Sequence, residues 1–362
     1  MIQKTRFRSK LFSARSLALF VLGGIAGIGA FGCGAGAGTG VVGVGDESPL
    51  IAYVALDREF SEPILKYYEK KTGRRVDAIY DVESTKSVGL AQRIIAERTS
   101  PRCDVYWNNE ILNTIRLQRR GLLEPIKTAH GDEIPATFKA KDGTWFGFAA
   151  RARVILVNTE IVADKDRPKG IRDMLDPKWK GKIGLAKPLF GTTATHAACL
   201  FAAWGEEKAK EYYEKMKANG VQIFSGNKAV AQAVGAGRIA FGMTDTDDSL
   251  GEIDAGNPVA IVYPDREPDQ LGTLFIPNVV SVIKGCPHPK AALELVDDLL
   301  KPDVEIALAK GPSAQIPLNP NVNLKLRVET PKTVHPMEVD FDAAAKLWDI
   351  AADFLTREFA DN

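Results

Sequence analysis

The sequence predicts an α/β fold with two lobes, and three observations lead to this prediction. Short apolar runs alternate with amphipathic segments from residue 48 onward, which is typical of a mostly parallel sheet with helical connections. Two β-type runs, at residues 146–157 and 273–283, are unusually long and lie far apart in the sequence. The length of 362 residues also exceeds one typical domain. A chain that leaves one lobe and later returns to it needs two crossings, so we expect a hinged ligand cleft between the lobes.

The individual elements follow from periodicity and from helix start and stop signals. For the first helix, Ser61 fits the N-cap, Glu62 and Pro63 fit the first turn, and Gly73 fits the far end. The other elements are assigned from apolar patterning. We expect strands at 50–56, 75–80, 103–107, 146–157, 182–186, 222–225, 238–243, 259–263 and 273–283, and helices at 61–71, 87–98, 196–204, 289–300 and 340–359.

The composition is that of an ordinary soluble globular protein. Hydrophobic residues make up 45% of the chain, charged residues make up 26%, and the formal net charge is +1. These values exclude a disordered, collagen-like or coiled-coil chain. A near-neutral balance also lacks the basic surface that phosphate contacts require, so we expect no nucleic-acid partner.

The first 47 residues differ from the rest of the chain. Basic residues without any acidic residue precede an apolar stretch at 16–32, and this layout predicts an export signal over residues 1–32. Cys33 follows Ala30-Phe31-Gly32, which resembles the cleavage box of bacterial lipoproteins. We therefore expect a lipid on Cys33, a glycine-rich linker at 33–47, and a location in the periplasm or at the cell surface. An uncleaved N-terminal membrane anchor is the alternative.

The other three cysteines, Cys103, Cys199 and Cys286, are widely separated and form no C-x-x-C pair. This spacing excludes a zinc ribbon and a thioredoxin-like motif. We expect buried free thiols, with one internal disulfide as the alternative.

Catalysis has little support in the sequence. The four histidines, His130, His196, His288 and His335, do not have metal-ligand spacing, and no nucleophile elbow or P-loop is present. For His196 we expect a packing role. We therefore expect neither enzymatic activity nor a resident cofactor; a secreted enzyme and a sensor ectodomain are the less favoured alternatives.

A hydroxyl-rich segment after the strand at 182–186 predicts an anion site. Thr192, Thr193, Ala194 and Thr195 come directly before the helix expected at 196–204. The free N–H groups of a helix start, its dipole and nearby hydroxyls all favour negative charge. Simple N-capping is the alternative, but it would explain only one of the three hydroxyls.

Acidic residues follow three of the expected strands. Asp57 follows the first strand, Glu110 follows the third, and Asp245, Asp247 and Asp248 follow the strand at 238–243. Carboxylates this close repel one another unless a cation or hydrogen-bond donors offset the charge. The pattern therefore predicts a cation or ammonium site, while turn formation or helix capping is the alternative.

These segments together resemble the ferric-iron-binding type of periplasmic solute-binding protein, which supplies an ABC importer. The resemblance implies the periplasmic-binding-protein type II fold, with a first lobe at 48–150 and 275–320 and a second lobe at 151–274. It also implies a C-terminal helical segment at 321–362 and a monomer that delivers a small inorganic or phosphorylated ligand to a permease and ATPase complex. The matching segments extend over residues 50–322 and are 103–110, 121–126, 151–153, 179–184, 227–230, 236–238 and 316–318.

The resemblance also implies which residues form the site. The family's histidine ligand falls at Asp57, its glutamate ligand at Glu110, and its consecutive tyrosines at Asp247 and Asp248. The implied anion site comprises Thr192, Thr193, Ala194, Thr195, Asn227 and Asp245.

Loss of the tyrosines leaves two interpretations. In the first, Asp57, Glu110, Asp247 and Asp248 bind Fe(III) or a similar hard cation through oxygen, and a synergistic anion completes the shell. In the second, the cleft binds a phosphorylated or aminophosphonate organic solute. Its anionic end would then lie on residues 192–195 and its cationic end on the acidic residues.

Overall fold

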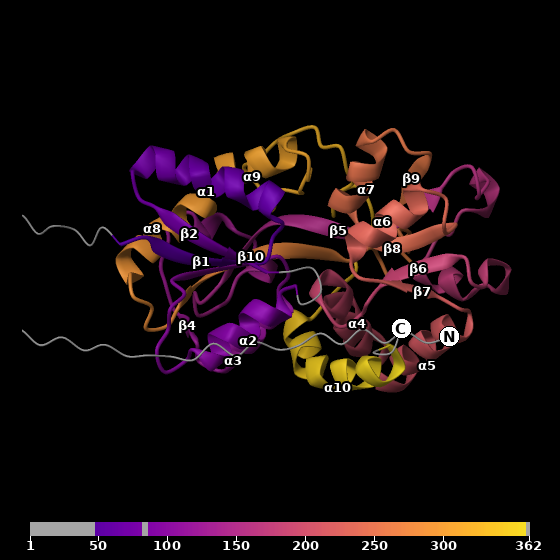
Figure 1. Ribbon diagram of the computed structural model, residues 1–362, viewed down its shortest axis with the longest axis horizontal. Coiled ribbons are helices and arrows are strands. Elements are labelled where there is room, and N and C mark those ends of the chain that lie inside the picture. The colour runs from indigo at the N-terminus through magenta and orange to yellow at the C-terminus, as the bar shows by residue number, and fades with distance from the viewer. Residues whose placement is uncertain (1–47, 82–85, 360–362) are drawn as a thin grey trace, which may run out of the picture. The chain divides into compact units, whose positions relative to one another are not determined.

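The computed structural model describes residues 48–81 and 86–359. Within them, ten strands form one sheet in the order β2-β1-β3-β10-β5-β8-β6-β7, with β4 paired to β10 and β9 paired to β5 (Figure 1). The strands are β1 (Leu50–Val54), β2 (Val76–Tyr80), β3 (Val105–Asn108), β4 (Leu123–Glu124), β5 (Phe146–Asn158), β6 (Ile183–Ala186), β7 (Gln222–Phe224), β8 (Phe241–Asp245), β9 (Val259–Val262) and β10 (Phe275–Ile283).

The expected export signal at 1–32, the linker at 33–47 and the lipidated Cys33 lie outside the described residues. Among the helices in the described part of the chain, none combines the length and the apolar character needed to cross a membrane.

Strand β5 joins two halves of the sheet. Its residues 146–152 pair with β10, whereas its residues 153–157 pair with β8, so the partner changes between Ala152 and Arg153. We call β1–β4 and β10 the first half and β6–β9 the second half. Every residue of β5 and β10 is buried, because both faces of the sheet are covered. The prediction of two long strands is confirmed.

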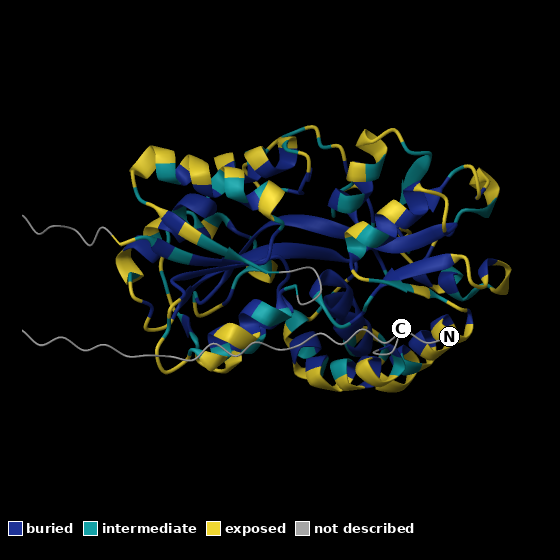
Figure 2. Cartoon of the chain, viewed as in Figure 1, coloured by how far each residue is buried: buried dark blue, intermediate teal, exposed yellow. Residues whose placement is uncertain are grey.

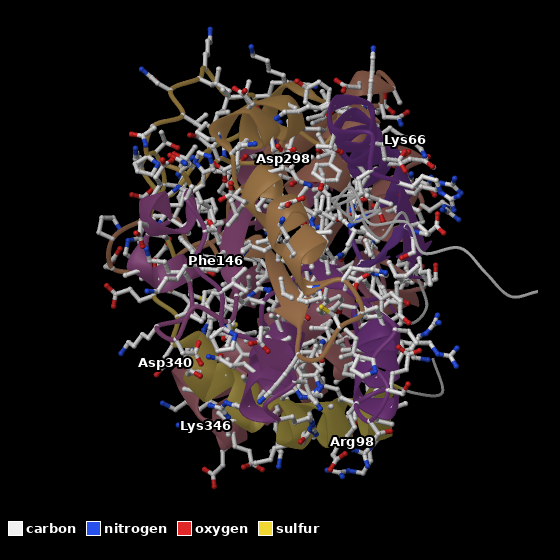
Figure 3. All side chains as sticks on the ribbon, turned by 90° about the vertical axis from the view of Figure 1, so that its left-hand side faces the viewer. Lys66, Arg98, Phe146, Asp298, Asp340 and Lys346 are labelled. Atoms are coloured by element: carbon white, nitrogen blue, oxygen red, sulfur yellow. The ribbon has the colours of Figure 1, made fainter. Side chains whose placement is uncertain are left out.

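Helices cover both faces of the sheet. In the end-on view of Figure 3, Lys66 on α1 and Lys346 on α10 lie at opposite extremes of the molecule. Helix α10 packs against α3 and α4. The helices are α1 (Arg58–Thr72), α2 (Val88–Ala96), α3 (Leu112–Arg119), α8 (Pro289–Leu299) and α9 (Pro302–Lys310) with the first half, α4 (Gly191–Trp204), α5 (Glu206–Ala218), α6 (Asn227–Gly235) and α7 (Thr246–Asp254) with the second half, and α10 (Phe341–Phe359).

Helix α1 begins at Arg58, about one turn before the start that the sequence predicts. Asp57 occupies the N-cap position without a side-chain capping bond. Ser61, the expected N-cap, lies inside the helix, and its hydroxyl donates to the carbonyls of Leu56 at 3.2 Å and Asp57 at 3.0 Å. Because the helix starts early, Asp57 lies shortly after the carboxyl end of β1, and its carboxylate makes no capping bond to the helix. The predicted end at Gly73 is confirmed, with φ at 74°.

Buried residues lie on the strands and on the inward faces of the helices, whereas exposed residues lie on the outer faces (Figure 2). Cys103, Cys199 and Cys286 are buried free thiols, which confirms the prediction made for them. Burial is the main cause that raises the pKa of Cys286 to about 11, so its thiol stays protonated at neutral pH.

Candidate functional site

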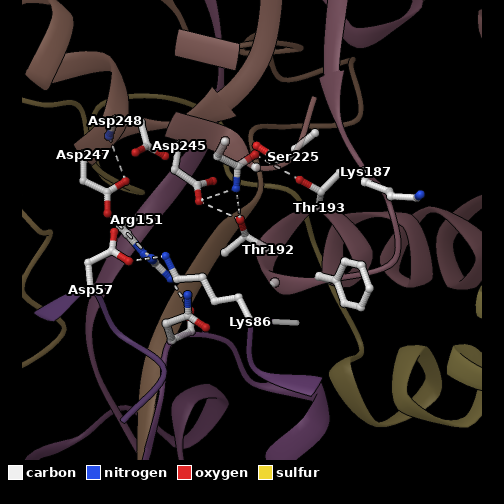
Figure 4. Close-up of a pocket in the computed structure, with 16 residues that line it drawn as sticks. Asp57, Lys86, Arg151, Lys187, Thr192, Thr193, Ser225, Asp245, Asp247 and Asp248 are labelled. Carbon is white, nitrogen blue, oxygen red and sulfur yellow. Dashed lines mark hydrogen bonds and ion pairs between the residues drawn. The ribbon is translucent and has the colours of Figure 1, made fainter. Parts of the chain in front are cut away.

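A cavity lies where strands from both halves end, as Figure 4 shows. Its walls follow the carboxyl ends of β1, β3, β6, β7 and β8, which is where ligands bind in open α/β sheets. The cavity is narrow, with a volume of about 20 Å³. It is lined by Asp57, Lys86, Asn109 and Arg151 on the side of the first half, and by Ala186, Lys187, Phe190, Gly191, Thr192, Thr193, Ser225, Gly226, Asn227, Asp245, Asp247 and Asp248 on the side of the second half.

A buried ion pair between Arg153 and Asp245 supports the cavity wall, of which Asp245 is a lining residue. Arg153 on β5 donates to the Asp245 carboxylate at 2.7 Å, and Thr192 donates to the same carboxylate at 2.6 Å. Burial would raise the pKa of Asp245, but the guanidiniums of Arg153 and Arg151 outweigh that effect and hold it below its usual range. The sequence assigned Asp245 to anion binding. An ionised carboxylate bonded to Arg153 would repel an anion, so we expect Asp245 to orient Arg153 and Thr192 rather than to contact the anion.

Two further carboxylates lie in the first turn of α7. Oxygen atoms of Asp245, Asp247 and Asp248 all lie within 4.8 Å of one another. Burial raises the pKa of Asp247 to about 6, since the nearby Arg151 opposes this shift only in part and Asp245 and Asp57 add to it. Burial, with repulsion from Asp247 and Asp245, raises the pKa of Asp248 well above its usual range. Ionisation of Asp247 and Asp248 is therefore disfavoured while the protein alone surrounds them.

Basic side chains approach the same wall. Lys86 forms an ion pair with Asp57, and the Nη1 of Arg151 lies 3.6 Å from the Oδ2 of Asp247. Figure 4 shows Asp57, Asp247 and Asp248 on one side of the cavity and Lys187 on the other. The sequence did not identify Lys86 or Lys187. Arg151 was noted there only as part of a matching segment.

The hydroxyl-rich segment is only partly in the cavity. Helix α4 begins at Gly191, so all three threonines lie within its first turns rather than before it. Thr192 and Thr193 line the cavity, and Thr193 donates to the Oδ1 of Asn227 at 3.0 Å. Ala194 and Thr195 do not line it. Each of the three hydroxyls donates to a protein acceptor. Of the four residues expected at 192–195, two therefore line the cavity, and their hydroxyl protons are already shared with Asp245 and Asn227.

Glu110, which we expected to be a metal ligand, does not line the cavity. Its fully buried carboxylate accepts the backbone N–H of Leu112 at 2.6 Å and of Asn113 at 3.1 Å, at the start of α3. It also accepts the hydroxyl of Thr195 at 2.8 Å, from the second half. These contacts favour the helix-capping alternative for Glu110.

The preceding residue, Asn109, takes the position in the cavity. Its side chain is 2% exposed, and within the described part of the chain its Oδ1 has no hydrogen-bond partner. Its backbone carbonyl accepts from Arg151. Strand position alone gave no signal to prefer Asn109 over Glu110.

The site offers oxygen ligands and charged groups. Asp245, Asp247 and Asp248 form the single cluster of metal-type ligands found among the described residues. His196 lies close behind the cavity, where burial lowers its pKa to about 3, and Arg153 adds to this effect. It is therefore a neutral packing residue at physiological pH, as the sequence predicted.

Comparison with known proteins gives a consistent picture. A family model described as bacterial extracellular solute-binding protein matches residues 64–336. "Iron uptake protein A1" of Synechocystis sp. is 24% identical over 294 residues, which are 77% of this chain and 79% of that protein.

Solved structures show the same fold. The iron-bound HitA structure from Pseudomonas aeruginosa matches with a TM-score of 0.77 and 23% identity, covering 86% of this chain and 99% of that one. The periplasmic binding protein AfuA from Actinobacillus pleuropneumoniae, with fructose-6-phosphate bound, matches with a TM-score of 0.76 and 23% identity. It covers 86% of this chain and 98% of AfuA. The predicted two-lobed periplasmic-binding-protein type II fold is confirmed.

Proposed function

The chain belongs to the family of bacterial extracellular solute-binding proteins, and we propose that it is the extracytoplasmic binding protein of an ABC importer. Its cargo is Fe(III) or a similar hard cation, held with a synergistic anion in the cavity between the two halves. The lobes close on the cargo by a hinge motion of β5 and β10. The loaded protein then delivers the cargo to the permease and ATPase complex of the membrane, to which a lipid on Cys33 tethers it.

The observation that carries this proposal is the group of carboxylates at the start of α7. Asp247 and Asp248 have raised pKa values because they are buried and repel neighbouring acids. A bound cation offsets that repulsion. Ionisation of these carboxylates, which is unfavourable in the free protein, therefore becomes favourable when the cation binds. Asp57 and Asn109 line the same cavity and offer further oxygen donors. Glu110 is no longer included in the ligand set.

The size of the cavity supports a small cargo. Its volume of about 20 Å³ is on the order of what a single water molecule requires. An ion fits such a space, whereas a sugar phosphate needs the two halves to separate further. Lys187 and the starts of α4 and α6, at Gly191 and Asn227, form the opposite wall, and we assign the synergistic anion to this wall.

A second candidate cargo is a phosphorylated or aminophosphonate organic solute. The specific observation in its favour is that three basic residues, Lys86, Arg151 and Lys187, line the same cavity as the acidic ones. A zwitterion matches such a surface, with its ammonium group on the carboxylates and its phosphonate on the basic side. The AfuA structure contains a phosphorylated sugar on the same fold.

Equilibrium competition for Fe(III) against citrate separates these candidates. The variant with Asp247→Asn and Asp248→Asn is expected to lose Fe(III) affinity by at least a hundredfold, because two anionic ligands become neutral. Asp254→Asn is the matched control, since Asp254 ends the same helix and pairs with Arg327 outside the cavity.

Unchanged Fe(III) affinity in the double variant contradicts the metal proposal. A thermal-shift series with Fe(III), Ca(II), 2-aminoethylphosphonate and fructose-6-phosphate then identifies the class of cargo, because a ligand well above its Kd raises the melting temperature.

A further inference from the structure

The two halves are connected by an ion pair outside the cavity. Lys228, the second residue of α6, places its Nζ 3.0 Å from the Oε1 of Glu59, the second residue of α1. Helix α1 belongs to the first half and α6 to the second, so the pair bridges the cleft. Both side chains are about half exposed, at 56% for Lys228 and 55% for Glu59.

The pair lies at a surface hollow next to the cavity. The hollow is lined by Asp57, Arg58, Glu59, Glu62 and Lys228. Asp57 also lines the cavity, so the hollow and the cavity meet at that residue. Opening the cleft at this point requires the Lys228 ammonium to leave Glu59.

Local helix structure alone does not favour Lys228 at its position. A cation in the first turn of a helix opposes the helix dipole, whereas the carboxylate of Glu59 in the first turn of α1 is favoured by it. The charges that compensate Lys228 come from outside α6. The hydrogen bond to Glu59 is the main cause that raises the pKa of Lys228, and attraction to Glu59, Asp57 and Asp248 adds to it. The electrostatic stabilisation of the Lys228 ammonium is therefore largest when the two halves are together.

We propose that the Glu59–Lys228 ion pair is an interlobe latch that slows the opening of the cavity. Glu62 offers an internal comparison, because it lines the same hollow but bonds to Arg58 on its own helix at 2.8 Å. Removal of either carboxylate changes the charge of the hollow equally. Only the loss of Glu59 breaks a contact between the halves.

Hydrogen exchange of the full chain without added cargo tests the latch. Glu59→Gln is expected to speed exchange in peptides of the cavity wall, such as residues 187–195, by roughly threefold, since exposed ion pairs contribute modestly. Glu62→Gln is expected to leave these peptides unchanged, and peptides from β1 report any general loss of stability. In 1 M salt the wild-type protein should approach the Glu59→Gln rate, because salt screens the pair.

Combining the two substitutions sharpens the test. If the residues act as a pair, the variant with Glu59→Gln and Lys228→Gln exchanges no faster than Glu59→Gln alone. Equal exchange in Glu59→Gln and Glu62→Gln, or additive effects of Glu59→Gln and Lys228→Gln, overturns the proposal. Because no cargo is present, either result is independent of what the cavity binds.

Discussion

Asp245 and Asp247 are two residues apart in the sequence, yet their carboxylates are in opposite electrostatic states. Asp245 ends β8 and bonds to Arg153 and Thr192, which hold its pKa below the usual range. Asp247 begins α7, and its nearest cation, Arg151, lies 3.6 Å away and also donates to a backbone carbonyl. The comparison indicates that the protein uses one carboxylate to build the cavity and leaves the other to meet a ligand. Residue type is the same in both places, so the difference comes from the partners.

The largest expected effect comes from breaking the buried ion pair between Arg153 and Asp245. Arg153→Met leaves Asp245 buried without its cation, and we expect the free energy of unfolding to fall by about 3–5 kcal/mol. Chemical denaturation measures this change. Arg75→Gln, which breaks an exposed pair with Asp77, is the control and should cost at most about 1 kcal/mol. Similar costs for the two variants would mean that the buried pair is not structural.

A smaller effect is expected at Asp247, with the opposite sign. Its pKa is about 6 in the folded protein and near 3.8 when unperturbed, so the folded state binds the proton more tightly. Stability is therefore lost as pH rises from about 4 to 6, by roughly 2–3 kcal/mol in total. We expect Asp247→Asn to remove this loss, as measured by denaturation at several pH values.

Asp254→Asn controls for a general effect of charge removal. The bond to Arg327 is the main cause that lowers the pKa of Asp254, so its stabilisation is present above the unperturbed pKa and is lost as pH falls. The difference in free energy of unfolding between wild type and Asp254→Asn should therefore change with pH in the direction opposite to that for Asp247→Asn. If the free energies of unfolding of wild type and Asp247→Asn change in parallel between pH 4 and 7, then folding does not raise the pKa of Asp247.

The smallest of these effects concerns Glu110. Because it caps α3 and accepts from Thr195, we expect Glu110→Gln to lower the free energy of unfolding by about 1–2 kcal/mol. Fe(III) affinity in citrate competition should change less than threefold, since the carboxylate does not reach the cavity. A loss of Fe(III) affinity comparable to that of the Asp247 and Asp248 double variant would restore Glu110 as a ligand.

Much of the site could be predicted because it depends on where strands end. Asp57, Thr192 and the aspartates at the end of β8 and the start of α7 were identified from their places after apolar runs, and all of them line the cavity. Asn227, which also lines it, was identified only from the family resemblance. Lys86 and Lys187 could not be identified in this way, because a lysine beside a strand or helix is usually a solvated surface residue. Only the pairing of the two halves shows which lysines face the cavity.

The pattern of the sequence by itself determined the α/β architecture, the two long crossing strands and the edge of the sheet where ligands gather. These features depend on the spacing of apolar residues along the chain, and the local geometry of helices and strands sets that spacing. The tertiary structure decided the direction of single side chains: Asn109 faces the cavity, whereas Glu110 caps α3 and meets Thr195 from the second half. It also decided which aspartate receives an arginine. Such choices depend on contacts between segments far apart in the chain, and no local pattern records them.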